Sequence, residues 1–247
     1  MKAMVLAAGL GTRLRPLTND RPKALVTLDG RTLLEIAIAR LRAVGVDEVI
    51  VNTHHHAGMV DEYLRANGNF GMRIEVSREE TLLDTGGGLK QAGWFFEQGA
   101  QEPFLVHNVD VLSRFDLGRM MRFHAESGAL ATLALQQRET SRYLLLDETG
   151  ALCGRRTGQD GEAQMARAAT GAKAWAFAGI HVVSPAIFQK MTETGAFSII
   201  DCYLRLAAAG EKIAAFDAGE SYWRDLGKPE SIERAEQDLR SGIYPLH

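Results

Sequence analysis

The chain has 247 residues, 46% of them hydrophobic, and a formal net charge of −3 at pH 7. This length and apolar content are sufficient for one large α/β domain with a substantial core. Such a small net charge does not indicate binding to nucleic acid or to a membrane surface. No apolar run approaches the roughly 18–20 residues of a membrane helix, so we expect a cytoplasmic protein.

The first predicted element is a buried strand over residues 3–8, a short apolar run that stops at Gly9. Gly9 and Gly11 would let the following loop approach a ligand closely, and its free backbone N–H groups could bind phosphate. Arg13, Arg15 and Lys23 add positive charge to the same region. The pattern favours a polyphosphate site, although an ordinary turn with solvated basic residues has the same glycine spacing.

Strands and helices then alternate. A strand and turn at 26–30 precede a helix from Thr32 to Gly45, with Thr32 as its N-cap. Strands at 46–52 and 72–77 flank a helix from about 59 to 67, which predicts a parallel sheet with right-handed crossovers. The three histidines at 54–56 do not indicate a metal site, because adjacent side chains diverge, but one of them could line the crevice.

Two segments near the middle of the chain supply further candidate site residues. Gly86, Gly87 and Gly88 open a predicted helix and would allow close approach of a flat or anionic ligand, unless they form only a flexible loop. The apolar strand 103–106 leads to Asp110. A carboxylate at the carboxyl end of a central strand could hold Mg²⁺, or it could simply cap a turn.

The second half of the chain continues the alternation. Its polar, glycine-containing segment 157–173 is interpreted as a mobile loop over one side of the site. Cys153 and Cys202 are predicted to be buried, reduced thiols rather than a disulfide. The predicted strands are 129–135, 143–146, 151–153, 176–183 and 213–216, and the predicted helices are 117–127, 185–191, 199–209 and 231–240.

Several of these segments together resemble the sugar-1-phosphate nucleotidyltransferases. The resemblance is densest in Leu6-Ala7-Ala8-Gly9-Leu10-Gly11-Thr12-Arg13-Leu14-Arg15-Pro16-Leu17-Thr18 and in Pro22-Lys23-Ala24-Leu25-Val26. Thr85 to Gly88 is similar to the second nucleotide loop, and 222–230 is similar to the Trp-x-Asp-x-Gly-Lys-Pro segment. Where the family usually has Asn-Gly-Asp, this chain has Val109 in place of the glycine, and His107 is a candidate for a compensating sugar contact.

The resemblance implies a fold and a reaction. The fold is a Rossmann-like, doubly wound, mixed and mainly parallel α/β sheet with helices on both faces, in a single domain over 1–247. A nucleotide-binding half is expected at about 1–112 and a sugar-binding half at about 113–247, without a β-helix extension. The reaction is Mg²⁺-dependent transfer of a nucleotidyl group from a nucleoside triphosphate to a sugar 1-phosphate, which releases pyrophosphate.

The substrates and the assembly remain open at this point. Chain length and the Thr-Gly-Gly-Gly loop are most similar to the N-acetylmuramate 1-phosphate uridylyltransferases. GTP or dTTP with mannose, heptose or glucose 1-phosphate is an alternative, and so is a non-catalytic regulator that binds nucleotide sugar. The protein is expected to be a monomer or a homodimer.

The resemblance also implies roles for individual residues. Arg13 would contact the departing pyrophosphate and Lys23 the reacting phosphates, so that catalysis rests on positioning and charge stabilisation. Asp110 and Asp225 would hold Mg²⁺. The expected sugar contacts are Asn108 and Gly179, and the expected nucleotide contacts are Ala8, Gly9, Gly11, Thr12, Arg13, Gly86, Gly87 and Gly88.

Overall fold

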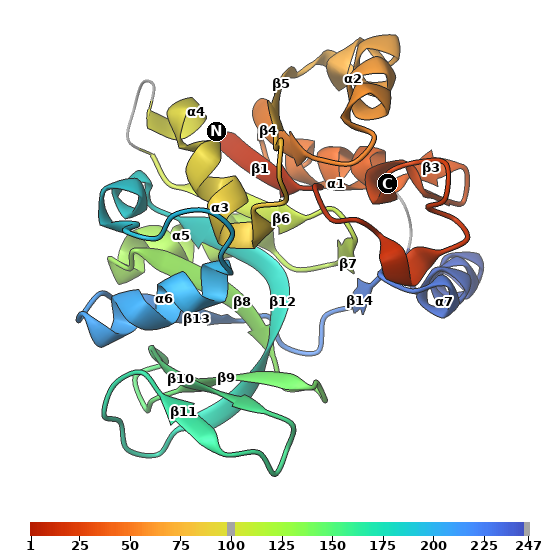
Figure 1. Cartoon of the computed structure of the whole chain (residues 1–247). Helices are drawn as coiled ribbons and strands as arrows, with labels where there is room; N and C mark the ends of the chain where they lie inside the picture. Colours follow the sequence, from red (N-terminus) through yellow and green to blue (C-terminus); the bar gives the residue numbers. More distant parts are fainter. Residues whose placement is uncertain (98–101, 245–247) are drawn as a thin grey trace.

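The computed structural model describes residues 1–97 and 102–244. Its centre is a ten-stranded mixed sheet, and two small two-stranded sheets lie beside it (Figure 1). The strands of the large sheet are β1 (Lys2–Leu6), β4 (Glu48–Thr53), β5 (Arg73–Arg78), β6 (Phe104–Asn108), β8 (Ala131–Gln136), β9 (Arg142–Leu146), β10 (Leu152–Thr157), β11 (Ala163–Met165), β12 (Lys173–Val183) and β13 (Ile213–Asp217). The small sheets pair β2 (Thr27–Leu28) with β3 (Arg31–Thr32) and β7 (Val111–Ser113) with β14 (Trp223–Asp225).

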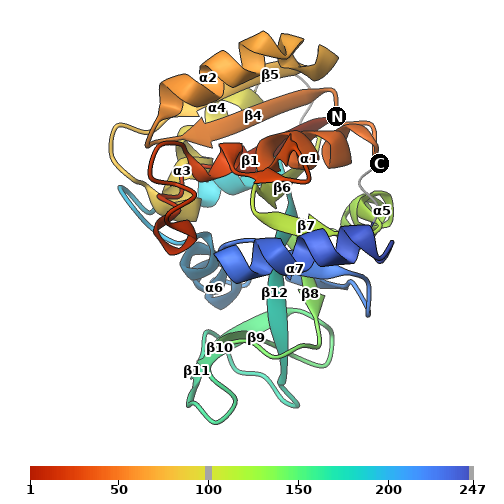
Figure 2. The ribbon, with the colours of Figure 1, turned by 90° about the vertical axis from the view of Figure 1, so that its right-hand side faces the viewer.

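Helices cover both faces of the large sheet (Figure 2). One face carries α1 (Leu33–Arg42), α2 (Ala57–Ala66), α5 (Leu117–Ser127) and α7 (Pro229–Arg240), and the other carries α3 (Asp84–Gln91), α4 (Gly93–Glu97) and α6 (Ile199–Ala208). Short 3₁₀ turns are η1 (Thr12–Leu14), η2 (Lys23–Leu25), η3 (Gly68–Gly71) and η4 (Pro185–Lys190). The predicted α/β class and two-sided helix cover are confirmed.

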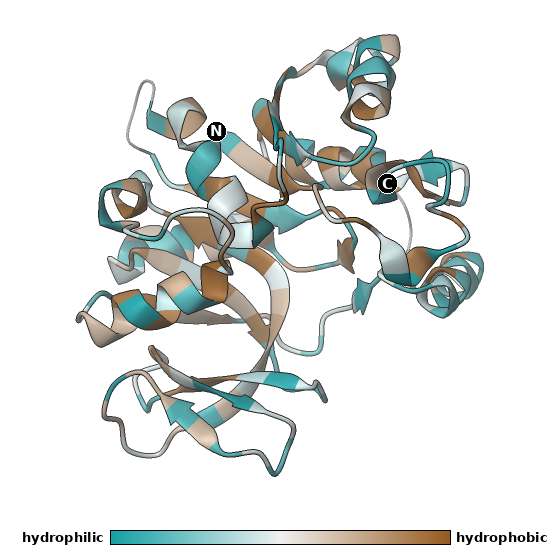
Figure 3. Ribbon diagram, in the orientation of Figure 1, coloured by the Kyte–Doolittle hydropathy of each residue, from teal (hydrophilic) through white to brown (hydrophobic). Residues whose placement is uncertain are grey.

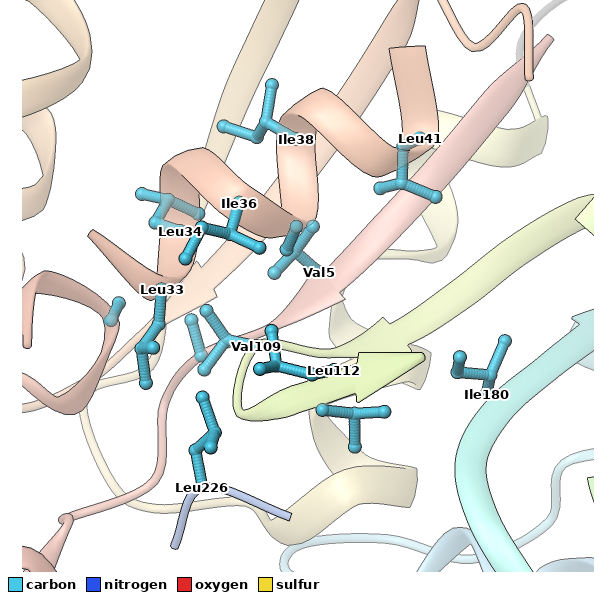
Figure 4. Close-up of a cluster of buried hydrophobic side chains, with 14 of the residues drawn as sticks. Val5, Leu33, Leu34, Ile36, Ile38, Leu41, Val109, Leu112, Ile180 and Leu226 are labelled. Carbon is cyan, nitrogen blue, oxygen red and sulfur yellow. The ribbon is translucent and has the colours of Figure 1, made fainter. Parts of the chain in front are cut away.

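The two cores follow from the alternation of side chains along the strands. In β1, Val5 belongs to the cluster under α1, whereas Met4 belongs to the cluster under α3 and α6. Figure 4 shows the first cluster, where Leu34, Ile36 and Leu41 of α1 pack over the strand. Hydrophobic residues accordingly concentrate along the central strands, while the outward surface of α7 is hydrophilic (Figure 3).

The sheet divides into a parallel part and a largely antiparallel part. β1 pairs in parallel with β4 and β6, and β4 with β5, as the strand–helix–strand order predicts. The long strand β12 then runs antiparallel to β6, β8 and β9. The N-cap of α1 is also confirmed, because Thr32 Oγ1 accepts a hydrogen bond from Glu35 N at 3.1 Å.

Two local predictions differ from the structure, and two short strands were not predicted. The segment 157–173 is not a single loop, because it contains β11, which pairs with β10, and it leads into β12 at Lys173. The segment 185–191 forms the 3₁₀ turn η4 rather than an α-helix. β7 and β14 have three residues each, too few to produce a detectable alternation, and their pairing depends on contact between distant segments.

The cysteines behave as expected. Cys153 and Cys202 are both free and buried, and burial raises the pKa of Cys202 to about 11. Over the two described stretches of the chain, no helix is long and apolar enough to cross a membrane.

Candidate active site

A cavity of about 420 Å³ lies at the carboxyl ends of β1 and β6, the edge at which open α/β sheets bind ligands. Its wall is assembled from segments that are far apart in the sequence. Seven of the predicted site residues line it: Ala8, Gly9, Arg13, Lys23, Asn108, Asp110 and Asp225.

The loop after β1 is held in shape by Gly11 and Thr18. Gly11 has a φ of +64°, and a Cβ there would lie 2.9 Å from Thr18 Cγ2. Thr18 Oγ1 in turn donates a hydrogen bond to the Gly11 carbonyl at 2.8 Å. Gly11 and Thr18 therefore shape the loop that presents Ala8, Gly9 and Arg13, and direct nucleotide contact by Gly11 and Thr12 stays a prediction.

Lys23 and Asp110 form an ion pair inside the cavity. Lys23 Nζ contacts Asp110 Oδ2, and the two side chains are only 13% and 11% exposed. The short turn η2 positions Lys23, whereas Asp110 lies two residues after the end of β6. The basic loop and the acidic strand end, which are separated by 87 positions, thus meet in one place.

The small β7–β14 sheet brings the second acidic residue to the same cavity. Asp225 pairs in register with Val111, the residue after Asp110, and Leu226 N donates to the Asp110 carbonyl at 2.8 Å. Asp225 Oδ1 accepts a hydrogen bond from Gly227 N at 2.6 Å. A Cβ at Gly227 would lie 2.6 Å from both Asp225 Oδ1 and Arg13 Nη2, so the missing side chain lets Arg13 pack beside Asp225.

A second cavity, of about 560 Å³, adjoins the first, because Asn108 and Asp225 line both. Gly179 lies in its wall with a φ of +74°, and a Cβ there would lie 2.8 Å from Asn108 Nδ2. The predicted sugar residues are therefore neighbours. Opposite them, the guanidinium of Arg138 lies 3.6 Å from the centre of the Trp223 ring. Burial lowers the pKa of Arg138, and the Asp225 carboxylate opposes this shift.

Residues 2–147 match the family model described as nucleotidyl transferase. The chain belongs to the nucleotidyl transferase family. It is 36% identical to the N-acetylmuramate alpha-1-phosphate uridylyltransferase of Caulobacter vibrioides, over 96% of each chain. It is 27% identical to the D-glycero-alpha-D-manno-heptose 1-phosphate guanylyltransferase of Aneurinibacillus thermoaerophilus, over 98% of this chain and 100% of that one.

A solved structure supports the fold of this nucleotidyltransferase. HddC from Yersinia pseudotuberculosis, complexed with GMP-PN, superimposes with a TM-score of 0.76 at 21% identity, over 96% of this chain and 99% of that chain. The fold class predicted from the sequence is confirmed by this match, and the enzyme class by the family.

Gly86, Gly87 and Gly88 are closely packed in the nucleotidyltransferase, and their contact with the nucleotide stays a prediction. The N–H groups of Gly86 and Gly87 both donate to the Phe197 carbonyl, at 2.9 and 3.3 Å. A Cβ at Gly86 would collide with the Phe197 ring, and one at Gly88 would lie 2.6 Å from Glu79 Oε1. These glycines permit close packing of α3, and Asp84 and Thr85 at the start of the same helix line the cavity.

His107 and His54 form hydrogen bonds within the protein, and Val109 packs in its core. His107 is 1% exposed, its Nδ1 is hydrogen-bonded to the Asn108 carbonyl, and burial lowers its pKa to about 4, so the expected sugar contact is wrong. His54 is hydrogen-bonded to the Glu79 carbonyl at 2.9 Å. Within residues 1–97 and 102–244, no group of three metal-binding side chains includes any histidine. Val109 packs into the core near Leu112 and Leu226 and also lines the first cavity, so it takes the place of the usual glycine at the cavity wall (Figure 4).

Two polar residues of the cavity were missed by the sequence analysis. Asn52 and Glu79 are 3% and 4% exposed and both line the first cavity. Asn52 Oδ1 accepts from Ala7 N and Asn52 Nδ2 donates to Glu79 Oε1, both at 2.7 Å, while Glu79 Oε2 accepts from Leu83 N at 2.9 Å. Asn52 ends a predicted strand and Glu79 follows another, the same signal that identified Asp110. The pair forms an acceptor-rich wall that suits a ligand with N–H donors.

Proposed function

We propose that this nucleotidyltransferase joins UTP to N-acetylmuramate 1-phosphate, giving UDP-N-acetylmuramate and pyrophosphate. The observation that carries the reaction is the convergence of Arg13, Lys23, Asp110 and Asp225 on one cavity at the carboxyl edge of the sheet. The substrate pair is supported by the 36% identity, over 96% of both chains, to the Caulobacter vibrioides enzyme. The Aneurinibacillus thermoaerophilus relative, at 27%, makes GTP with heptose 1-phosphate the alternative.

The proposed mechanism needs no protein nucleophile. An oxygen of the sugar phosphate attacks the α-phosphorus of the triphosphate in line, and the bond to the β-phosphate oxygen breaks as pyrophosphate leaves. Lys23 balances the charge on the reacting phosphates and Arg13 that on the departing pyrophosphate. Positioned cations of this kind act in a partly dry cavity, where they stabilise developing charge more strongly than water does.

The two carboxylates suit Mg²⁺. This ion is commonly bound through one or two carboxylates together with substrate phosphate oxygens, which is the donor set that Asp110 and Asp225 offer. In the described part of the chain, each carboxylate uses one oxygen in its hydrogen bonds, Oδ2 for Asp110 and Oδ1 for Asp225. When bound, the ion would neutralise phosphate charge and polarise the reacting phosphoryl group.

Asn52 and Glu79 are proposed to bind the base. Uracil and guanine each carry a ring N–H that can donate a hydrogen bond to a buried carboxylate, so Glu79 is compatible with either nucleotide. The preference for uridine rests on the more similar relative. A cytoplasmic location and a monomeric or dimeric assembly stay predictions.

A pyrophosphate-release screen tests the proposal. UTP, GTP and dTTP are each combined with N-acetylmuramate, mannose, heptose and glucose 1-phosphates in the presence of Mg²⁺. We expect the highest kcat/KM for UTP with N-acetylmuramate 1-phosphate. A different best pair would replace the substrates while leaving the reaction intact. Binding of UDP-N-acetylmuramate without pyrophosphate release from any pair would instead identify a non-catalytic regulator.

A further inference from the structure

The second cavity lies in a notch of the large sheet. β12 pairs with β9 through Lys173 to Ala176 and with β6 through Ile180 to Val183. The three residues between these stretches, Phe177 to Gly179, have neither strand as a partner at this edge. The cavity is lined by these residues and opens between the end of β6 and the start of β9.

The wall of the notch carries more positive charge than its own acidic residues neutralise. Arg138, Arg142, Arg155 and Arg156 all line it, against Asp201 and Asp225. Three of these arginines come from β9 and β10, the antiparallel strands at the bottom of Figure 1. An excess of guanidinium groups in a cavity next to a nucleotide site indicates an anionic ligand.

Two of the four arginines have partners within the protein. Arg155 forms an ion pair with Asp201, and its Nε donates to Gln164 Oε1 at 2.8 Å. Arg138 stacks on the Trp223 ring and donates from Nη2 to the Phe177 carbonyl at 2.8 Å. The negative charge of Asp225 also favours its charged form. Both arginine side chains therefore have hydrogen-bond acceptors within the protein, although Arg138 Nε, like Arg156 Nε, is buried without a partner.

Arg142 and Arg156 are different. Neither takes part in an ion pair with another side chain in the two stretches that the structure describes. Arg156 is half-buried, its guanidinium lies over the Tyr143 ring, and its Nε is buried without a hydrogen-bond partner. A cation in such surroundings lowers stability unless something supplies an acceptor.

The strand register places both side chains at the notch. Arg156 pairs with Tyr143 across the β9–β10 ladder, and Arg142 directly precedes Tyr143. Adjacent positions of a strand project to opposite faces of the sheet. Both arginines nevertheless line the same cavity.

The position of the notch relative to the first cavity determines which part of a bound substrate Arg142 and Arg156 would contact. Arg13 and Lys23 lie in the first cavity, where the phosphates are proposed to bind, and the two cavities share Asn108 and Asp225. A sugar whose 1-phosphate lies beside Asp225 therefore extends into the notch. Arg142 and Arg156 lie in that part of the wall, where they would face the substituents of the sugar ring.

We infer that the sugar 1-phosphate carries a carboxylate on its ring and that Arg142 and Arg156 bind this group. The inference rests on the proposed nucleotidyl transfer and deepens it, because it names the residues that select the acceptor. N-acetylmuramate bears such a carboxylate in its lactyl ether, whereas mannose, glucose and heptose do not. Arginine suits this role, since its planar fork matches a carboxylate through two parallel hydrogen bonds.

The test compares three acceptors with UTP and Mg²⁺. They are N-acetylmuramate 1-phosphate, its methylamide at the lactyl carboxylate, and N-acetylglucosamine 1-phosphate, which lacks the lactyl ether. The ratio of kcat/KM for acid and amide reports recognition of charge, because the two acceptors are similar in size. We expect the wild type to favour the acid by roughly ten- to hundredfold, the size of a charge-assisted hydrogen bond.

Variants assign this preference to particular residues. Arg156→Gln and Arg142→Gln should each lower the acid-to-amide ratio by about tenfold, and Arg156→Lys should retain part of it. Arg155→Gln is the matched control, since it removes a charge of the same cavity that already has a partner in Asp201. Its ratio, and that of Arg65→Gln on the exposed side of α2, should stay close to the wild-type value.

Three results would overturn the inference. They are a wild-type ratio near one, an Arg155→Gln effect as large as that of Arg156→Gln, and an equal loss with all three acceptors in Arg156→Gln, which would place Arg156 at the shared 1-phosphate. No turnover with any acceptor would refute the proposed function instead. Calorimetry of acid and amide binding then decides the inference: tighter binding of the acid that depends on Arg156 supports it, and equal binding overturns it.

Discussion

Replacement of Lys23 by alanine separates catalysis from stability in this protein. Lys23 is the cation proposed to meet the reacting phosphates, and it is also the ion-pair partner of Asp110 in a site where both side chains are about nine-tenths buried. Loss of one positioned charge typically costs about 3 kcal/mol in the transition state, or about a hundredfold or more in rate. The same change leaves the Asp110 carboxylate partly buried and without its partner.

The second effect has its own magnitude. A buried charged group that loses its hydrogen-bond partner destabilises a protein by about 2 kcal/mol, or roughly 4–8 °C in melting temperature for a chain of this size. Asp110→Asn in the Lys23→Ala background removes the unpaired charge, so the double variant should regain most of the stability and none of the activity.

Pyrophosphate release and thermal unfolding, measured on the wild type, Lys23→Ala and the double variant, check both effects. Turnover of Lys23→Ala within a few-fold of the wild type would refute the catalytic role. A double variant as unstable as the single variant would refute the account of the Lys23–Asp110 pair.

The other predictions concern the metal site, the glycine helix and acid stability. Asp225→Ala should lose most turnover and need more Mg²⁺; normal activity would remove Asp225 from the metal site. Gly86→Ala should destabilise the fold by about 1–3 kcal/mol in urea unfolding because its Cβ collides with Phe197, whereas Gly58→Ala in α2, where a Cβ meets nothing within 4 Å, should be neutral or stabilising. Burial lowers the pKa of His181 to about 3, so the unfolded chain binds its proton first as the pH falls below about 6.5. The contribution of His181 to the free energy of unfolding should therefore fall by up to about 1.4 kcal/mol per pH unit below that point, and His181→Gln should weaken the pH dependence of unfolding by that amount.

The sequence was sufficient for features that depend on nearby residues. The apolar spacing in α1 and its Thr32 cap lie within a few positions of each other, so the helix could be predicted with its N-terminus. The strand 3–8, the loop with Gly9 and Arg13, and the acidic end of β6 were recognisable for the same reason, and the resemblance linked them to Asp225.

Features that depend on contact between distant segments were decided only in the folded chain. Gly86 and Gly87 look like a ligand loop in sequence, yet the Phe197 carbonyl takes up their N–H groups. The β7–β14 pair and the notch beside β12 depend on which strands become neighbours, and this is settled by packing of the whole sheet. The sequence shows that Arg155 and Arg156 are both cations. Only the tertiary structure places Asp201 beside Arg155 as an ion-pair partner and, among the described residues, leaves Arg156 without one.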